Sequence, residues 1–258
     1  MLPFGMRGKT MVTLTEDGHE AMQSKWLPWR FRLAYRIFMN HAAQSATCIN
    51  TYSQTSSREV ARRFRIDPTR IFVNHLGISK TISYQPSAKS FSYILYVGQA
   101  FPRRHLKETI LAFKHIAPEF PDLKLITIGI DKYNPAIITD LVKNDPQIIW
   151  KERVGEDELA ALYANAKLFV YVSTNEAFGL PPLEALAYGV RPIVADTPIS
   201  HELFGDDAIY TQPSVDGIAD AIRRGLASTK PEPVIKFTWQ AHTDRFLELC
   251  RGITNHKS

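Results

Sequence analysis

The sequence is poor in cysteine, with only Cys48 and Cys250 among 258 residues. The two lie far apart and outside any Cys-x-x-Cys or Cys/His ligand spacing, so neither a disulfide framework nor a zinc site is indicated. The sequence also lacks an Asp-x-Asp motif, so we expect no metal clamp and no metal cofactor. This use of cysteine favours a reducing, cytoplasmic setting.

Long apolar runs are absent as well. No window supplies the roughly 20 consecutive apolar residues of a membrane-spanning helix, and the basic N-terminal residues precede no apolar stretch of signal-peptide length. Hydrophobic residues make up 45% of the chain, which is enough for a buried core in one large or two small domains. The formal net charge of +5 favours an anionic partner, whether a nucleotide, a nucleic acid or an acidic membrane.

From residue 91 onward, short apolar runs alternate with amphipathic stretches, which is typical of consecutive βα units around a parallel sheet. The predicted strands are residues 93–97, 123–128, 168–172 and 192–195. The predicted helices are residues 106–115, 135–142, 157–165, 181–188 and 215–226. This order predicts a doubly wound, Rossmann-like α/β domain.

The N-terminal part contains fewer units: strands at 10–14, 47–50 and 70–73, a helix after Pro28, and a helix at 56–64. These match only the last third of a Rossmann-like domain. Residues 84–90 are polar and aperiodic, as a linker between domains would be. We therefore expect a partial domain over residues 1–84, a complete domain over 85–230, and a C-terminal segment over 231–258.

A loop at the head of the second domain combines a glycine with two arginines. Gly98 follows the first strand, and Arg103 and Arg104 precede the next helix. Parallel α/β sheets bind ligands in such loops, where glycine permits close backbone approach and guanidinium groups hold phosphates through charge-assisted hydrogen bonds. The alternative for two loop arginines is an ordinary solvated surface.

A second loop carries two glutamates, Glu176 and Glu184, around a predicted helix start at Pro181. Free N–H groups and the positive end of the helix dipole favour phosphate there. Because carboxylates repel phosphate, we expect Glu184, in the first helical turn, to bind ribose hydroxyls and Glu176 to bind hydroxyls of a transferred sugar. The alternative is that both merely stabilise the helix dipole, worth about 0.3 to 1 kcal/mol each.

The segment from Glu176 to Glu184, with Phe178, Gly179 and Leu180 inside it, resembles the signature of the retaining GT-B glycosyltransferases of family 4, the group-1 glycosyl transferases. Further similarity lies at Val97-Gly98 with Arg103-Arg104, at 158–166, at 184–189, at 192–195 and at Phe237-Thr-Trp239. The resemblance implies a GT-B fold with an N-terminally truncated first domain and a C-terminal helix that crosses back onto that domain.

The resemblance implies roles for these residues in binding a UDP-, GDP- or dTDP-sugar. Arg103 and Arg104 match a basic pair on the donor diphosphate, although the second residue is usually lysine. The backbone of residues 178–180 would contact phosphate and sugar, Glu176 the sugar and Glu184 the ribose.

Three weaker candidates follow from the same resemblance. Arg153 and Val154 lie near where the family seats the base. Family members also place a histidine near the reacting sugar, just after the strand that matches residues 10–14. His19 is the candidate for that catalytic histidine, and the alternative is a surface histidine.

The implied reaction transfers a sugar from a nucleoside diphosphate to a hydroxyl of a glycan or lipid-linked acceptor, with retention of configuration. The alternatives are a nucleotide-sugar-binding module that depends on a partner and a GT-B sugar-nucleotide epimerase. A nucleic-acid partner is not expected, because no recognition motif is found.

The resemblance implies an alternative role for the basic, aromatic segment from Lys25 to Arg36, because family members that act on lipid-linked acceptors often use a similar region at the membrane surface. The apolar residues of this segment also suit packing against a sheet, which we favour because the basic residues fall on more than one helical face.

Overall fold

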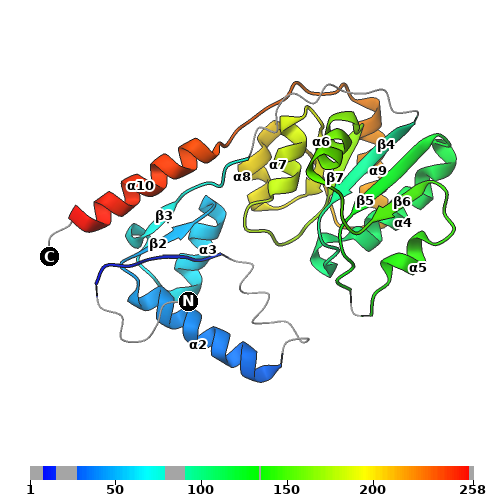
Figure 1. Ribbon diagram of the computed structural model, residues 1–258. Helices are drawn as coiled ribbons and strands as arrows, with labels where there is room; N and C mark the ends of the chain where they lie inside the picture. The colour runs from blue at the N-terminus through cyan, green and yellow to red at the C-terminus, as the bar shows by residue number, and fades with distance from the viewer. Residues whose placement is uncertain (1–7, 16–27, 79–90, 134, 256–258) are drawn as a thin grey trace. The chain divides into compact units, whose positions relative to one another are not determined.

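The computed structural model describes residues 8–15, 28–78, 91–133 and 135–255. The chain divides into two compact units (Figure 1). The smaller unit contains Met1–Gly77, Asn175–Phe178 and Phe237–Ser258, and the larger unit contains Ile78–Thr174 and Gly179–Lys236. The predicted linker at 84–90 and the candidate His19 lie outside the described residues.

The larger unit is built on a six-stranded sheet in which all neighbouring strands are parallel, in the order β6-β5-β4-β7-β8-β9. The strands are β4 (Ser92–Val97), β5 (Leu123–Ile128), β6 (Ile148–Lys151), β7 (Leu168–Tyr171), β8 (Pro192–Ala195) and β9 (Ile209–Thr211). This is the doubly wound order, so the predicted Rossmann-like α/β class is confirmed. The strand order reverses between β4 and β7, which is where such sheets bind ligands.

Helices connect the strands of the larger unit: α4 (Leu106–Ile116), α5 (Ile138–Val142), α6 (Glu156–Asn165), α7 (Leu180–Ala187), α8 (Pro198–Phe204) and α9 (Val215–Ala227). Helix α4 packs against α9, and α6 packs against α7 (Figure 1). Right-handed crossovers place helices on both faces of a parallel sheet, so its strands are buried on both sides. Every residue of β7 and β8 is accordingly buried.

Some elements of the larger unit differ from the sequence prediction. Strands β6 and β9 and helix α8 were not predicted, and the helix predicted for 135–142 begins only at Ile138. The carboxylate of Asp131 accepts hydrogen bonds from the N–H groups of Tyr133, Ile137 and Ile138, at 2.9, 2.8 and 2.8 Å. These bonds favour a loop over a longer helix.

The smaller unit contains a three-stranded parallel sheet, ordered β1 (Met11–Thr13), β2 (Cys48–Thr51) and β3 (Ile71–Val73). Helices α2 (Trp29–Ser45) and α3 (Gln54–Phe64) enclose a small core with Ile49 and Val60. In the described residues, this sheet has fewer strands than the sheet of the larger unit. Phe31 and Leu33 of α2 are 66% and 49% exposed, so packing against a sheet, which we favoured from sequence, is wrong for these two residues. None of the helices in the described ranges is long and apolar enough to cross a membrane.

The C-terminal helix α10 (Trp239–Asn255) belongs to the smaller unit. Asn74 Nδ2 donates a hydrogen bond to the His242 carbonyl at 3.1 Å. A Cβ atom added to Gly77 would lie 2.0 Å from the backbone nitrogen of Trp239, so only glycine permits this close approach. Residues 74–77 therefore run directly against the first turns of α10.

Candidate functional site

Two glycines end the neighbouring strands β4 and β5. Gly98 has φ +147° and Gly129 has φ +148°, which side chains rarely adopt. A Cβ atom on Gly129 would lie 1.9 Å from the Gly98 carbonyl oxygen, and one on Gly98 would lie 3.2 Å from both Arg104 Nη1 and Tyr171 Cε2. The backbone at the reversal of strand order is thus closely packed and requires glycine.

The arginines after Gly98 lie on a turn of 3-10 helix, Pro102–Arg104. Arg104 Nη1 donates to the Gln99 carbonyl at 3.2 Å, and its guanidinium lies 5.3 Å from the ring centroid of Tyr171 at the end of β7. The Arg103 guanidinium lies 4.6 Å from the centroid of Phe101. Cation–π contacts of this kind orient both charges.

The structure joins the arginine loop to the loop after β7. The N–H of Thr174 donates to the Arg103 carbonyl at 3.0 Å, and the Thr174 hydroxyl reaches the same carbonyl at 3.3 Å. His105 Nε2 lies 3.4 Å from that hydroxyl. The sequence analysis named neither Thr174 nor His105 as a site residue. The only feature of the sequence that could have pointed to them is that they lie in the two loops with the arginines and the glutamates.

Helix α7 follows Gly179, which has φ +84°. Proline has no N–H, so Pro181 and Pro182 contribute no donor to the first turn, and only Leu180 and Leu183 carry N–H groups there. The first turn of α7 therefore offers fewer free N–H donors than the sequence analysis expected. The remaining donors and the positive end of the helix still favour an anion.

Glu184 lies in the second turn of α7 rather than in the first, because the helix begins at Leu180. The hydroxyl of Tyr163, a residue of α6 that is 2% exposed, donates to Glu184 Oε2 at 2.8 Å. The ring of Tyr188 stacks on that of Tyr163, with centroids 5.6 Å apart. A half-buried carboxylate held in this way is better suited to accept further hydrogen bonds than to stabilise a helix end.

Burial shifts the pKa of both groups in this pair. It raises the pKa of Glu184, and the hydrogen bond from Tyr163 opposes that shift. Burial, followed by the charge of Glu184, raises the pKa of Tyr163 well above its ordinary value. Tyr163 therefore stays a donor at neutral pH. Its position in α6 gave no sequence signal, because a tyrosine on a helix is usually a packing residue.

The middle of the predicted donor loop belongs to the smaller unit. Phe178 is 3% exposed, and its ring centroid lies 5.3 Å from that of Phe237 and 6.0 Å from that of His75. His75 and Phe237 stack with centroids 4.8 Å apart. Glu176, two residues earlier, is half-buried. Arg103, Arg104 and Glu184, by contrast, are residues of the larger unit.

The base-site candidates lie in the loop between β6 and α6. Arg153 is exposed, and Val154 is half-buried and packs against the core of the larger unit. Within the described ranges, no group of three or more His, Cys, Asp and Glu residues could hold a metal ion.

The relatives of this chain are glycosyltransferases. It is 26% identical over 207 residues to the O-antigen chain mannosyltransferase RfbU of Salmonella typhimurium, covering 75% of this chain and 58% of that protein. The chain thus spans less than two thirds of this curated relative.

Solved structures share the fold over most of the chain. Sucrose-phosphate synthase from Thermosynechococcus elongatus has a TM-score of 0.79 at 18% identity, covering 98% of this chain and 70% of that one. Anabaena HepE, in complex with UDP and glucose, has a TM-score of 0.74 at 16% identity, covering 95% of this chain and 72% of that one. The expected GT-B architecture is therefore confirmed. Residues 80–236 match the model of the glycosyl transferases group 1, and the chain belongs to this family.

Proposed function

We propose that this chain binds a nucleoside-diphosphate sugar and transfers the sugar to a hydroxyl acceptor with retention of configuration, as a family 4 enzyme without a metal ion. The observation that carries the proposal is the junction of two loops at the reversal of strand order. Thr174 ties the arginine loop to the loop that leads into α7, at 3.0 Å from the Arg103 carbonyl. Ligands of doubly wound sheets bind at this position.

Each residue of the site has a chemical role in this proposal. As the glycosidic bond lengthens, negative charge develops on the leaving diphosphate, and Arg103 and Arg104 stabilise it without reorganising. The backbone of Gly98 and of residues 178–180 approaches the phosphates. Glu184 accepts hydrogen bonds from the ribose hydroxyls, and Glu176 accepts them from the transferred sugar.

Four further assignments belong to the proposal. Arg153 and Val154 flank the base, and His19, outside the described residues, is the candidate for the catalytic histidine. The donor is a nucleoside-diphosphate mannose, which the mannosyltransferase relative supports. The acceptor is a hydroxyl of a glycan or of a lipid-linked glycan, used at the cytoplasmic face of a membrane.

A second candidate function is donor binding without transfer unless another polypeptide completes the acceptor side. The sheet of the smaller unit, which has three strands in the described residues, is the observation that favours this candidate. A sugar-nucleotide epimerase is the other alternative.

Incubating the purified chain with GDP-mannose, UDP-glucose and dTDP-glucose tests the proposal. Product anomers are followed by NMR, with and without a polypeptide that supplies the remaining length of the relatives. Release or transfer of an α-configured sugar from an α-configured donor supports retention, whereas a β product contradicts it. Binding without turnover by the chain alone, with turnover only when the second polypeptide is added, supports the module, and interconversion of nucleotide sugars supports the epimerase.

A further inference from the structure

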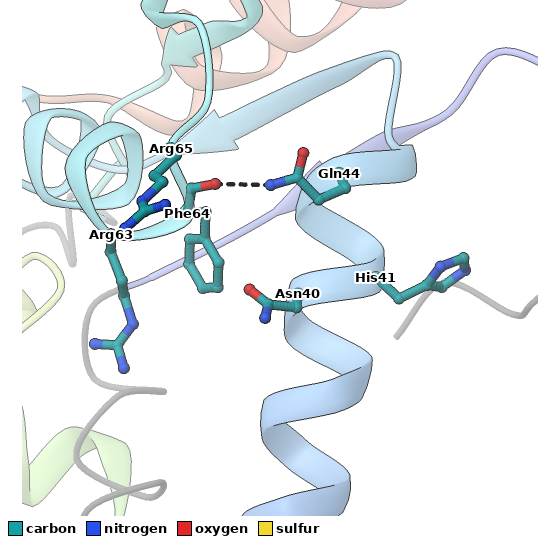
Figure 2. A pocket seen from close by; sticks show the side chains of 6 residues that line it. All are labelled: Asn40, His41, Gln44, Arg63, Phe64 and Arg65. Carbon is teal, nitrogen blue, oxygen red and sulfur yellow. Dashed lines mark hydrogen bonds between the residues drawn. The ribbon is translucent and has the colours of Figure 1, made fainter.

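Three non-glycine residues in the described part of the chain have a left-handed backbone. They are Arg65, His105 and Asn144, with φ of 52°, 47° and 60°. Arg65 and Asn144 follow α3 and α5, and left-handed residues commonly end helices. Figure 2 shows Arg65 at the end of α3, next to the Phe64 carbonyl that accepts a hydrogen bond from Gln44 Nε2 at 2.7 Å. His105 differs from both, because it immediately precedes an α-helix, α4.

The backbone position of His105 suits a smaller residue. Its N–H donates to the Pro102 carbonyl at 3.1 Å, and its carbonyl accepts from the N–H and the hydroxyl of Thr109, both at 2.9 Å. Glycine and asparagine adopt the left-handed region readily and are favoured at helix starts. The His105 side chain, by contrast, makes no capping hydrogen bond. The local backbone therefore does not explain the imidazole ring, and such exceptions cluster at functional sites.

The imidazole ring of His105 lies between two other side chains. Nε2 lies 3.4 Å from the hydroxyl of Thr174, in the loop after β7, and Nδ1 lies 3.5 Å from Glu108 Oε2, in the first turn of α4. The side chains of His105 and Glu108 are 22% and 29% exposed. Glu108 Oε2 is buried and has no hydrogen-bond partner among the residues that the structure describes. This oxygen therefore faces the ring and does not cap the first turn of α4.

The direction of each hydrogen bond follows from what its atoms can donate. The Thr174 hydroxyl lies 3.3 Å from the Arg103 carbonyl, which only accepts, so the hydroxyl hydrogen goes to Arg103. The hydroxyl oxygen then accepts from the ring, which makes His105 Nε2 the donor. The carboxylate of Glu108 beside Nδ1 strengthens this donor. A chain of contacts thus runs from Glu108 through His105 and Thr174 to the Arg103 carbonyl.

This chain of contacts joins the two loops of the proposed donor site. Arg103 and Arg104 lie on the turn immediately before His105, and Thr174 lies in the loop after β7. The Thr174 N–H donates to the Arg103 carbonyl at 3.0 Å, so the ring supports an existing backbone contact. A displacement of about 1 Å near a reacting centre costs on the order of 100-fold in rate. A side chain that holds both loops therefore keeps the arginines where phosphate charge develops.

We propose that His105 is a positioning residue of the donor site. Its ring, oriented by Glu108, holds the loop after β7 against the arginine loop through Thr174. The inference rests on the proposed function, because the arginines need this support only if they hold a diphosphate. The contact itself is a property of the protein without ligand, so it is tested separately.

Amide hydrogen exchange of the ligand-free chain, followed by NMR at the Thr174 N–H, tests the contact. The variant is His105→Asn, because asparagine accepts the left-handed backbone and its shorter side chain removes the ring. His115→Asn is the matched control, since His115 is exposed at the other end of α4. Both substitutions are repeated in Thr174→Val, which lacks the hydroxyl, and in Thr174→Ser, which keeps it. Urea unfolding of each variant reports global stability.

The proposal predicts that the Thr174 N–H exchanges about three- to tenfold faster in His105→Asn than in the unchanged protein, at the same urea midpoint. The acceleration should recur in the Thr174→Ser background and vanish in the Thr174→Val background. The control His115→Asn should change the rate by less than about twofold. Three results would overturn the contact: no acceleration, equal acceleration by both histidine variants, or acceleration that persists in Thr174→Val.

Calorimetric titration of GDP separates this inference from the proposed function. GDP affinity should fall about threefold or more in His105→Asn and stay unchanged in His115→Asn. Faster exchange at Thr174 with unaltered GDP affinity would overturn the positioning role. Absence of GDP binding by the unchanged protein would overturn the proposed function and the role of His105 in it, while the exchange rates still decide the contact.

Discussion

Tyr163 donates a hydrogen bond from its buried hydroxyl to Glu184 at 2.8 Å, which ties α6 to α7 at the proposed ribose site. Burial favours the neutral form of Glu184, so its pKa in the folded protein lies above its unfolded value. The resulting stability is present at low pH and is lost as pH rises through the raised pKa. Ligand binding has the opposite preference, because the ionised carboxylate is the better acceptor for ribose hydroxyls.

The affinity for nucleoside diphosphate should therefore fall as pH decreases through the raised pKa of Glu184. Tyr163→Phe removes the bond that lowers this pKa, so the midpoint should move to higher pH. Calorimetric titration with GDP or UDP across a pH series measures it. Tyr188→Phe, which removes a hydroxyl from the stacked ring, is the control, and coincident midpoints in all three proteins would exclude this role for Tyr163.

Loss of either arginine of the loop should slow transfer more than it weakens donor binding. Arg103→Gln and Arg104→Gln each remove charge stabilisation of the leaving diphosphate, so kcat should fall on the order of 100- to 1,000-fold. Arg224→Gln is the control, because Arg224 lies in α9 and donates to the Tyr210 carbonyl of the edge strand β9, so kcat should stay unchanged. Steady-state kinetics provide the readout, and a change in KM with an unaltered kcat would contradict electrostatic catalysis by these residues.

Gly129→Ala should destabilise the larger unit, because the new Cβ would lie 1.9 Å from the Gly98 carbonyl oxygen. The positive φ adds about 1 to 2 kcal/mol, so the total loss should exceed about 2 kcal/mol. Gly155→Ala is the matched control, because nothing lies within 4 Å of its Cβ and its φ is −71°. Urea unfolding measures both, and equal midpoints would contradict the close approach of the two strand ends.

The aromatic contacts of Phe178 should position Glu176. Phe237→Leu removes ring contacts to His75 and Phe178, each worth about 0.5 to 1.5 kcal/mol. Nucleotide-sugar affinity should fall up to about tenfold, while nucleoside-diphosphate affinity stays the same. Phe246→Leu, on the exposed side of α10, should change neither. A parallel loss of both affinities in Phe237→Leu would indicate general destabilisation instead.

The periodicity of the sequence predicted the parallel sheet because strands buried on both faces read as apolar runs. Strand β9 was missed because it has only three residues. Strand β6 was missed because only Ile148 of its four residues is buried and Lys151 is exposed, so it differs from the fully buried runs of β7 and β8. Helix α5 begins later than predicted because three backbone N–H groups donate hydrogen bonds to the carboxylate of Asp131. The hydrophobic periodicity of a sequence carries no information about such bonds.

Residues of the proposed site could be named from sequence where a residue type has one main use. Gly98 and Gly179 were named for close backbone approach, and the arginine pair was named for phosphate charge. The hydroxyl of Tyr163 and the tether from Thr174 to Arg103 were not predictable, because both join elements distant in sequence. Glu184 was placed one turn too early, since the prediction began the helix at Pro181.

The most direct test of the account compares Glu184→Ala with Glu176→Ala by calorimetric titration of GDP and GDP-mannose. The account predicts that Glu184→Ala weakens both ligands, because both contain ribose. Glu176→Ala should leave GDP binding unchanged and weaken only GDP-mannose. Equal and negligible effects of the two substitutions on both ligands would contradict the assignment of this loop as the donor site.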